Sequence, residues 1–288
     1  MLKTRICATV VCLDGVAVQT RSFGFFQKIG QPSLSVHYLD RWGADEIFVI
    51  DITPRSGSAS PDFELLRMCA PQTLSPLAFG GGITTVDHAI RAISSGADKV
   101  VINSALLDHH NLVSDISNQL GSQSVVVSVD AIEGNSGFEA YGWRNRRPSG
   151  IPVVDLIKKC EDLGAGEILL NSVAKDGSLE GFDLDLVADV VKSTTLPIVV
   201  SGGAGCPSDV LELVDRFNVS GVAIGNRLNH LEHSVAIFKS ALASRAHVRN
   251  EALSSYNSHN LTDQGRLLPL DEDMLGELVY ERVVKEVI

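Results

Sequence analysis

The chain has 288 residues, 44% of them hydrophobic, which is enough for one large core or two small ones. A net charge of −11 argues against nucleic acid as a partner, and no uncharged apolar run reaches about 18 residues, so we expect no membrane-spanning helix. The five cysteines lack the spacing of metal ligands. We expect them to be reduced thiols in a cytoplasmic protein that carries no metal and no cofactor.

Short apolar runs alternate with segments of helical spacing along most of the chain. The expected strands are 5–13, 46–51, 77–79, 99–102, 125–129, 167–170, 198–200 and 221–224. The expected helices are 32–42, 61–69, 84–95, 111–120, 153–163, 184–192, 207–217 and 232–245. A turn at Asp14-Gly15 and a loop that contains Phe23 lead to about residue 30, and 134–147 is expected to be a hairpin-like loop.

This alternation predicts a closed (β/α)₈ barrel over residues 1–247, with an open doubly wound sheet as the alternative. An internal duplication favours the barrel. Pro76-Leu-Ala-Phe-Gly-Gly-Gly-Ile-Thr84 is repeated as Pro197-Ile-Val-Val-Ser-Gly-Gly-Ala-Gly205, and the same spacing relates Gly43-Ala-Asp-Glu-Ile to Gly164-Ala-Gly-Glu-Ile. The chain therefore reads as two similar half-barrels, followed by a C-terminal extension, 248–288, which we expect to be partly helical.

The carboxyl ends of the strands are the expected position of the reactive groups in such a barrel. Each half carries a glycine-rich loop that leads into a helix, where free backbone N–H groups and the helix dipole favour anions. Two such loops predict a ligand with a phosphate at each end; the alternative is that the glycines only make tight turns. The candidate phosphate-binding residues are Gly81, Gly82, Asn103, Ser104, Asp176, Gly177, Gly202, Gly203, Gly225 and Asn226.

Asp130 ends a valine-rich strand, where a carboxylate is costly unless it faces a polar mouth or has a partner. It is the candidate general acid or base. At the opposite end, four charged residues begin four different strands: Arg5, Glu46, Lys99 and Glu167. Two cations and two anions there predict a ring of salt bridges that closes the barrel floor and stabilises the fold.

The chain from Arg5 to about Lys239 resembles the cyclase subunit of imidazole glycerol phosphate synthase, a (β/α)₈ barrel that works with a glutaminase. The motifs that carry the resemblance include Gly80-Gly-Gly-Ile, Gly96-Ala-Asp-Lys-Val, Val129-Asp130-Ala131, Asp176-Gly177 and Ser201-Gly-Gly-Ala-Gly205. The resemblance implies a heterodimer in which the glutaminase docks at the floor, near Asp98, and ammonia passes up the barrel. The four-residue ring would then be the ammonia gate.

The resemblance also implies two catalytic aspartates at the mouth, of which Asp130 is the second. The first is replaced by Val11 when the chain is aligned without gaps, and the lysine of the family's loop is replaced by Gln19. Asp14 aligns with the aspartate of the Asp-Gly turn instead. Losing half of an acid–base pair should weaken the histidine-pathway reaction, because each member contributes about 10²–10⁴-fold.

These departures resemble a divergent branch of the family, which works with a glutaminase and an ATP-dependent amidotransferase. That branch serves acetamidino groups on surface-polysaccharide sugars, and its barrel would be mainly an ammonia conduit. We prefer this interpretation, with the cyclase of histidine biosynthesis as the alternative.

Overall fold

Eight parallel strands form a closed barrel in the computed structural model, which describes residues 3–54, 60–108, 111–135, 137–143, 146–243, 246–249 and Leu268. The barrel strands are β1 (Arg5–Leu13), β4 (Ile47–Asp51), β5 (Leu77–Gly80), β6 (Lys99–Ile102), β7 (Val125–Gly134), β10 (Glu167–Ser172), β11 (Ile198–Ser201) and β12 (Gly221–Ile224). Neighbouring strands pair in chain order, and β12 pairs back with β1 from Arg5↔Gly221 to Ala8↔Ile224. The predicted closed (β/α)₈ barrel is confirmed, and the open sheet is excluded.

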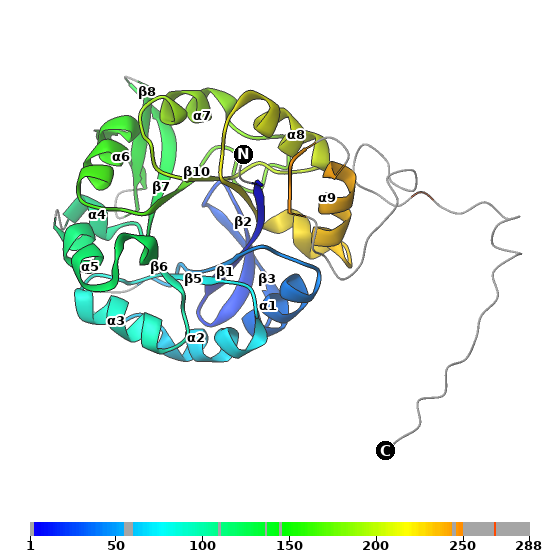
Figure 1. Cartoon of the computed structure of the whole chain (residues 1–288), viewed down its shortest axis with the longest axis horizontal. Coiled ribbons are helices and arrows are strands. Elements are labelled where there is room, and N and C mark those ends of the chain that lie inside the picture. The colour runs from blue at the N-terminus through cyan, green and yellow to red at the C-terminus, as the bar shows by residue number, and fades with distance from the viewer. Residues whose placement is uncertain are drawn as a thin grey trace, which may run out of the picture.

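Helices surround the barrel in the described part of the chain (Figure 1). They are α1 (Pro32–Arg41), α2 (Phe63–Cys69), α3 (Val86–Ser94), α4 (Ala105–Asp108), α5 (Leu112–Leu120), α6 (Val153–Asp162), α7 (Leu184–Val191), α8 (Pro207–Arg216) and α9 (Ser234–Leu242). The third helix begins later than expected, because its N-cap is Thr85, whose side chain accepts a hydrogen bond from the His88 N–H. The short helix α4 was not predicted.

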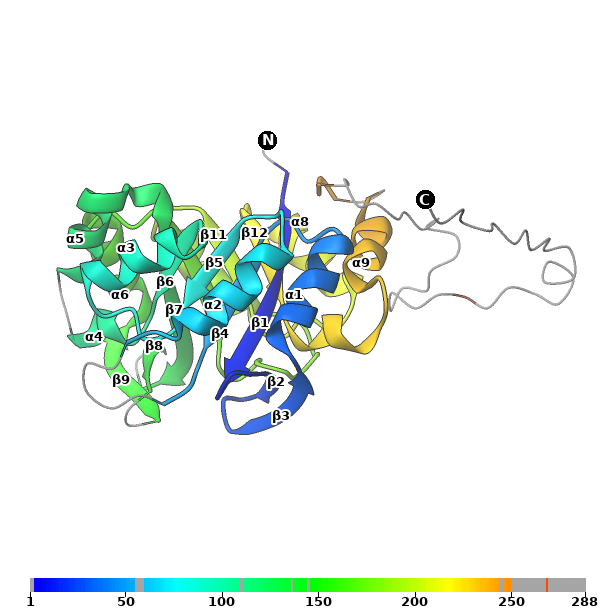
Figure 2. The same ribbon diagram turned by 90° about the horizontal axis from the view of Figure 1, so that it is seen from below.

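Two antiparallel hairpins extend the barrel wall at the carboxyl ends of the strands, which we call the mouth (Figure 2). One is formed by β2 (Val16–Arg21) and β3 (Phe25–Gly30), and the other by β8 (Gly137–Gly142) and β9 (Arg147–Pro152). The expectation of a loop from the Asp14-Gly15 turn to residue 30 was therefore wrong. Strand β2 pairs back onto the end of β1, and this pairing gives the segment regular structure despite the exposure of most of β3.

The strands are buried on both faces, as parallel barrel strands require. On β1, Ile6, Ala8 and Val10 pack toward the helices, while Cys7 faces the barrel interior. Each barrel strand contributes one buried apolar side chain to an interior layer: Cys7, Phe48, Ala78, Val101, Val126, Leu169, Val199 and Ala223. We call this set the apolar layer.

The two ends of the barrel chain meet at the opposite end, the floor. Thr4 forms a parallel bridge with Val248, and its N–H donates to the carbonyl oxygen of His247 at 2.9 Å. The buried Lys239 of α9 pairs with Asp45 at 2.7 Å, which ties the last helix to the foot of β4. The predicted helical content of the extension lies outside the described residues.

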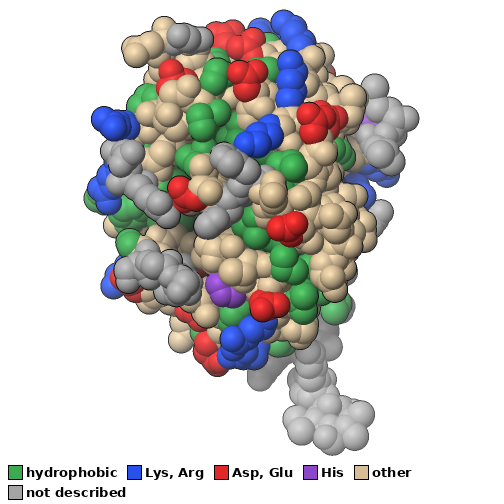
Figure 3. All heavy atoms as spheres, turned by 90° about the vertical axis from the view of Figure 1, so that its left-hand side faces the viewer, with side chains coloured by type: hydrophobic (Ala, Val, Ile, Leu, Met, Phe, Trp, Pro, Cys, Tyr) green, Lys and Arg blue, Asp and Glu red, His purple; other side chains and the backbone are tan. Residues whose placement is uncertain are grey.

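The outer surface over α4, α5 and α6 mixes side chains of both charges with scattered apolar groups (Figure 3). Among the residues that the structure describes, no helix is long and apolar enough to cross a bilayer.

Candidate functional site

Asp130 lies at the mouth and accepts hydrogen bonds from three side chains. The Asn103 amide and the Trp143 indole N–H each donate to Oδ2 at 2.8 Å, and the Asn171 amide donates to Oδ1 at 3.2 Å. Asn103 comes directly after β6, and Asn171 lies near the end of β10. Both strands pair with β7, which carries Asp130. The structure therefore brings the predicted acid–base residue into a fixed set of donors.

Burial raises the pKa of Asp130 above its ordinary value, because the carboxylate loses water. The hydrogen bonds from Trp143, Asn103 and Asn171 act in the opposite direction, since they favour the charged form. A carboxyl group with a raised pKa can hold a proton closer to neutral pH, which suits proton transfer at this position.

An aromatic cluster covers this side of the mouth. Phe23, from the turn of the β2–β3 hairpin, stacks on Trp143 with ring centroids 4.7 Å apart, and Tyr141 packs edge-on against both rings. The two hairpins thus meet beside Asp130. Sequence reasoning did not identify Trp143 or Tyr141; the only signal was the aromatic character of 134–147.

Val11 faces the barrel interior at the mouth. It lies four residues after Cys7 on β1, and residues separated by an even number along a strand share a face. Asp14 lies beyond the strand in an exposed turn, where its N–H donates to Thr53 Oγ1 at 2.8 Å. Gln19 donates to the Asn226 carbonyl oxygen at 3.3 Å and lies 3.2 Å from the His230 ring. The interior position of β1 at the mouth therefore carries no carboxylate.

The first glycine loop follows β5. Gly81 and Gly82 have φ of 120° and 74°, and a Cβ on Gly81 would lie 2.3 Å from the carbonyl oxygen of Asp51. Contact with the end of the neighbouring strand β4 therefore already requires glycine at position 81. Ser104 is exposed just before α4.

The second glycine loop follows β11 and is similar. A Cβ on Gly203, whose φ is 109°, would lie 2.1 Å from the carbonyl oxygen of Gly181, and one on Gly202 would contact Asn171 Oδ1 at 2.8 Å. Asp209 accepts the N–H groups of Gly205 and Cys206 at 2.8 and 2.9 Å. A phosphate bound here would therefore meet the N–H groups earlier in the loop.

Three of the candidate phosphate residues instead contact the β2–β3 hairpin. Asp176 accepts from Thr20 Oγ1 at 2.8 Å and from the Phe23 N–H at 3.3 Å. The Asn226 side chain, just after Gly225, bonds both backbone groups of Thr20, and a Cβ on Gly177 would lie 2.1 Å from the Thr20 carbonyl oxygen. These residues fix the hairpin over the mouth.

The floor ring forms as a closed circle of alternating charge. Arg5 bonds both Glu46 and Glu167, and Lys99 Nζ lies 2.7 Å from a carboxylate oxygen of each. The glutamates are almost fully buried, while the two cations are slightly more exposed. Burial alone would lower the pKa of Lys99, but the carboxylates of Glu46 and Glu167 raise it. The ring therefore pairs two basic side chains with two acidic ones.

Asp98 is exposed beside the ring, next to Lys99 in the chain. One of its carboxylate oxygens accepts the Leu77 N–H at 2.8 Å. The side chain therefore has a structural contact in addition to any role in docking. In the described parts of the chain, no group of three or more His, Cys, Asp or Glu side chains could hold a metal ion.

Comparison with known proteins decides the family. The sequence profile described as "Histidine biosynthesis protein" matches residues 5–234, which is nearly the whole barrel. The chain belongs to this histidine biosynthesis protein family. The eight barrel strands, the two glycine loops and Asp130 all lie within the matched residues.

Individual members of the histidine biosynthesis family match over most of their length. A Vibrio vulnificus protein, provisionally named imidazole glycerol phosphate synthase subunit hisF2, is 33% identical over 96% of this chain and 98% of its own. The subunit HisF of Streptococcus mutans is 34% identical over 84% of this chain and 97% of its own, and that of Methanocaldococcus jannaschii is 33% identical over 85% and 97%. The Vibrio match includes most of the C-terminal extension.

These names correct the preferred interpretation of the sequence. They support a HisF-like subunit of imidazole glycerol phosphate synthase, which was the alternative, better than a paralogue for acetamidino sugars and polysaccharides. The residues at Val11 and Gln19 favoured the paralogue, but these two departures outweigh neither the family match nor the names of the relatives.

Proposed function

We propose that this chain is the barrel subunit of a glutamine-dependent complex of the imidazole glycerol phosphate synthase type. It receives ammonia from a glutaminase subunit docked at the floor and uses the ammonia at the mouth. The observation that carries the proposal is the closed ring of Arg5, Glu46, Lys99 and Glu167 at one end of an apolar barrel whose other end holds Asp130. The relatives' names, which describe synthase subunits, support it.

The barrel interior suits neutral ammonia rather than ammonium. Moving an isolated ion into the apolar layer would carry a heavy desolvation cost, whereas an uncharged amine needs only a hydrogen-bond partner. Thr9, between Cys7 and Val11 on β1, offers one: its hydroxyl is buried and has no hydrogen-bond partner in the described part of the chain. The ring itself must open, and Lys99 suits this movement because its stem is long and flexible.

The mouth would hold a substrate with two phosphates between the two glycine loops, with Asp130 as acid or base. In the family reaction, ammonia adds to a ribulosyl intermediate, which is cleaved and cyclised. The Asn103, Asn171 and Trp143 donors would keep the Asp130 carboxyl in one orientation toward that substrate.

Arg5→Ala tests the gate in the complex reconstituted with a HisH-type glutaminase. We expect turnover with glutamine to fall more than turnover with added ammonium salt, because ammonium reaches the mouth from solution. Equal losses with both nitrogen sources would show that Arg5 supports the fold or the mouth rather than the passage of ammonia. Arg216→Ala, which removes an exposed pair with Glu212 on α8, is the control for loss of a surface cation.

A second candidate is favoured by Val11: a barrel that conducts ammonia but does not catalyse cyclisation. Mixing the purified protein with the ribulosyl intermediate and ammonium salt distinguishes the two. Cleavage at the rate of an ordinary cyclase subunit would exclude the conduit, and absence of cleavage with intact glutamine hydrolysis in the complex would favour it.

A further inference from the structure

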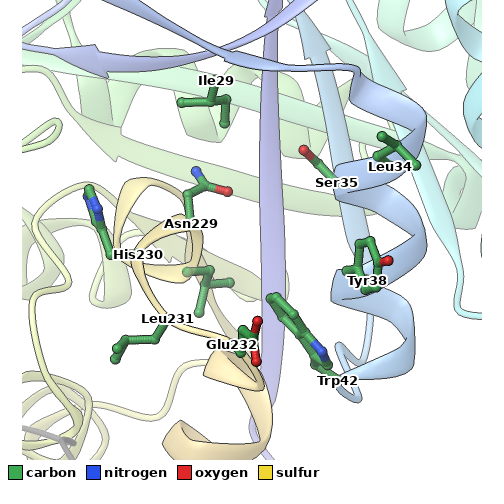
Figure 4. Close-up of a pocket in the computed structure, with 10 residues that line it drawn as sticks. Ile29, Leu34, Ser35, Tyr38, Trp42, Asn229, His230, Leu231 and Glu232 are labelled. Carbon is green, nitrogen blue, oxygen red and sulfur yellow. The ribbon is translucent and has the colours of Figure 1, made fainter.

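A groove of about 350 Å³ runs down the outside of the barrel between α1 and the segment that leads into α9 (Figure 4). Leu34, Tyr38 and Trp42 line one wall, and His230 and Leu231 line the other. Neither Asp130 nor a member of the floor ring lines the groove, and the activity proposed above does not use it.

The α1 wall of the groove is apolar and exposed. Leu34 and Tyr38 are 53% and 50% exposed, and Ile29, at the upper end, is 37% exposed. Leu34, Tyr38 and Trp42 are spaced four residues apart, so they form one stripe along the helix face. Such a stripe is the surface against which a second amphipathic helix packs.

The chain itself supplies a segment near this groove. The last continuous stretch of described backbone before residues 250–288 ends at the floor, where Val248 bridges to Thr4 beside Arg5. The lower end of the groove lies at the same foot of β1, because Asp45, three residues after Trp42, donates its N–H to the Ile6 carbonyl oxygen at 2.9 Å. The exit of the chain and the groove are therefore close together.

The composition of the segment matches the groove. Leu275, Leu278, Val279 and Val283 have the i, i+3, i+4, i+8 spacing of an apolar helix stripe. The acidic run Asp271-Glu-Asp273 precedes them, where negative charge favours the start of a helix. The segment is acidic overall, while Lys28 and Arg41 are exposed on the elements that flank the groove. A helix over 271–284 would span about 21 Å, somewhat more than the ~15 Å of α1.

We propose that residues 271–284 form an amphipathic helix that lies in this groove and covers Leu34, Tyr38 and Trp42. The C-terminal extension is then an additional layer of the barrel wall. It also reaches Ile29 at the end of β3, so it holds the hairpin whose Phe23 stacks on Trp143 beside Asp130. The proposal does not depend on the reaction that the mouth carries out.

Disulfide trapping in the full-length chain tests which face of the segment meets the groove. All five native cysteines are buried, so the reactions of newly introduced thiols can be distinguished from those of the native ones. We expect Tyr38→Cys to form an intramolecular disulfide with Leu275→Cys, Val279→Cys or Val283→Cys. The matched control, Glu277→Cys, lies on the opposite helix face and should react no faster than a thiol in an unfolded tail.

The product identifies the occupant. A monomeric disulfide whose yield does not change with protein concentration supports the proposal. Disulfide-linked dimers that increase with concentration would assign the groove to a second copy of the chain, and equal rates at all four tail positions would show that the segment does not dock; either result overturns it.

Hydrogen exchange gives a second readout without new thiols. In the full chain, Val279→Asp should make the amides of α1 and β3 exchange faster, because a charge in the apolar stripe prevents docking. Glu277→Gln should leave their exchange unchanged. Unchanged exchange of α1 in Val279→Asp would contradict the proposal even if the disulfides form.

Discussion

Asp130 shows how a single buried carboxyl depends on its donors. Burial raises its pKa, and three side-chain hydrogen bonds partly offset that rise. Because the pKa is higher in the folded state than in the unfolded chain, the contribution of Asp130 to stability is fully present at low pH. It is lost as the pH rises through the folded-state pKa. Each donor that is removed should shift this loss to higher pH.

Trp143→Phe removes one donor and keeps an aromatic ring against Phe23. We expect the pKa of Asp130 to rise further, so the acidic limb of the pH–rate profile should move to higher pH if Asp130 acts as a base. Carboxyl NMR titration and the pH dependence of kcat/KM check this. The chain's other tryptophan provides the control, since Trp42→Phe changes α1 far from the mouth. An Asp130 pKa that stays the same or falls would contradict the assigned hydrogen bond.

Val11→Asp should restore a second carboxylate at the interior end of β1. We expect cyclase turnover with ammonium salt to rise, by at most the ~10²–10⁴-fold of an acid–base group, and more when Gln19→Lys is added. The gain should disappear when Asp130→Asn is added to the double variant. If the double variant gains nothing, the mouth differs from that of an active cyclase at further positions.

Sequence reasoning located Asp130 because a charge at the end of a valine-rich strand is conspicuous. It did not find Trp143, because the contact depends on how the β8–β9 hairpin folds back over the mouth. The same limit applies to Asp176: its residue type suggested a ligand site, whereas its contacts to Thr20 and Phe23 depend on a second hairpin.

The repeated units of the fold are strand, glycine loop and helix: β5 with α3 and β11 with α8. Their strands were predictable because a closed parallel barrel buries both faces, which leaves short continuous apolar runs in the sequence. Strand β3 was not predictable, since its residues are mostly exposed and its conformation is set by pairing with β2.

The glycine loops need a test that does not disturb packing. Gly203→Val would be ambiguous, because its side chain would collide with Gly181 whether or not phosphate binds. Ser201→Asp instead adds a negative charge at the mouth end of β11, next to Gly202. We expect inorganic phosphate to raise the melting temperature of the wild type by mass action and to have little effect on this variant.

Asn218→Asp is the matched control for the phosphate experiment, since it adds the same charge at an exposed position at the foot of β12. The wild type and this variant should show the same shift in melting temperature. A full shift in Ser201→Asp would remove the second loop as a phosphate site.

The proposed function separates two tasks between the ends of the barrel, with ammonia entry at the ring on the floor and acid–base chemistry at Asp130 in the mouth. The floor was predictable in detail because charged residues at strand starts meet at one end of any such barrel. The covering of the mouth by two hairpins was not, since it depends on contacts between segments far apart in the chain.

Asp98→Asn tests the docking face without disturbing the fold. The asparagine oxygen can still accept the Leu77 N–H, so only the charge is lost. We expect slower association with the glutaminase and a weaker dependence of the association rate on salt, as for other charges at the rim of an interface. Surface plasmon resonance at two salt concentrations measures both. Asp155→Asn removes an exposed charge at the start of α6 and should not change binding; equal effects of the two variants would move the docking face elsewhere.

The bridge between Thr4 and Val248 has a consequence for the order of the two halves. Because the first and last strands of the barrel are already neighbours, a circularly permuted chain could join residue 249 to residue 3 and begin in the floor loop near Ser122. Such a chain would make the second half-barrel first, with every parallel pairing kept. The packing of the barrel therefore does not require that the first half-barrel precede the second along the chain.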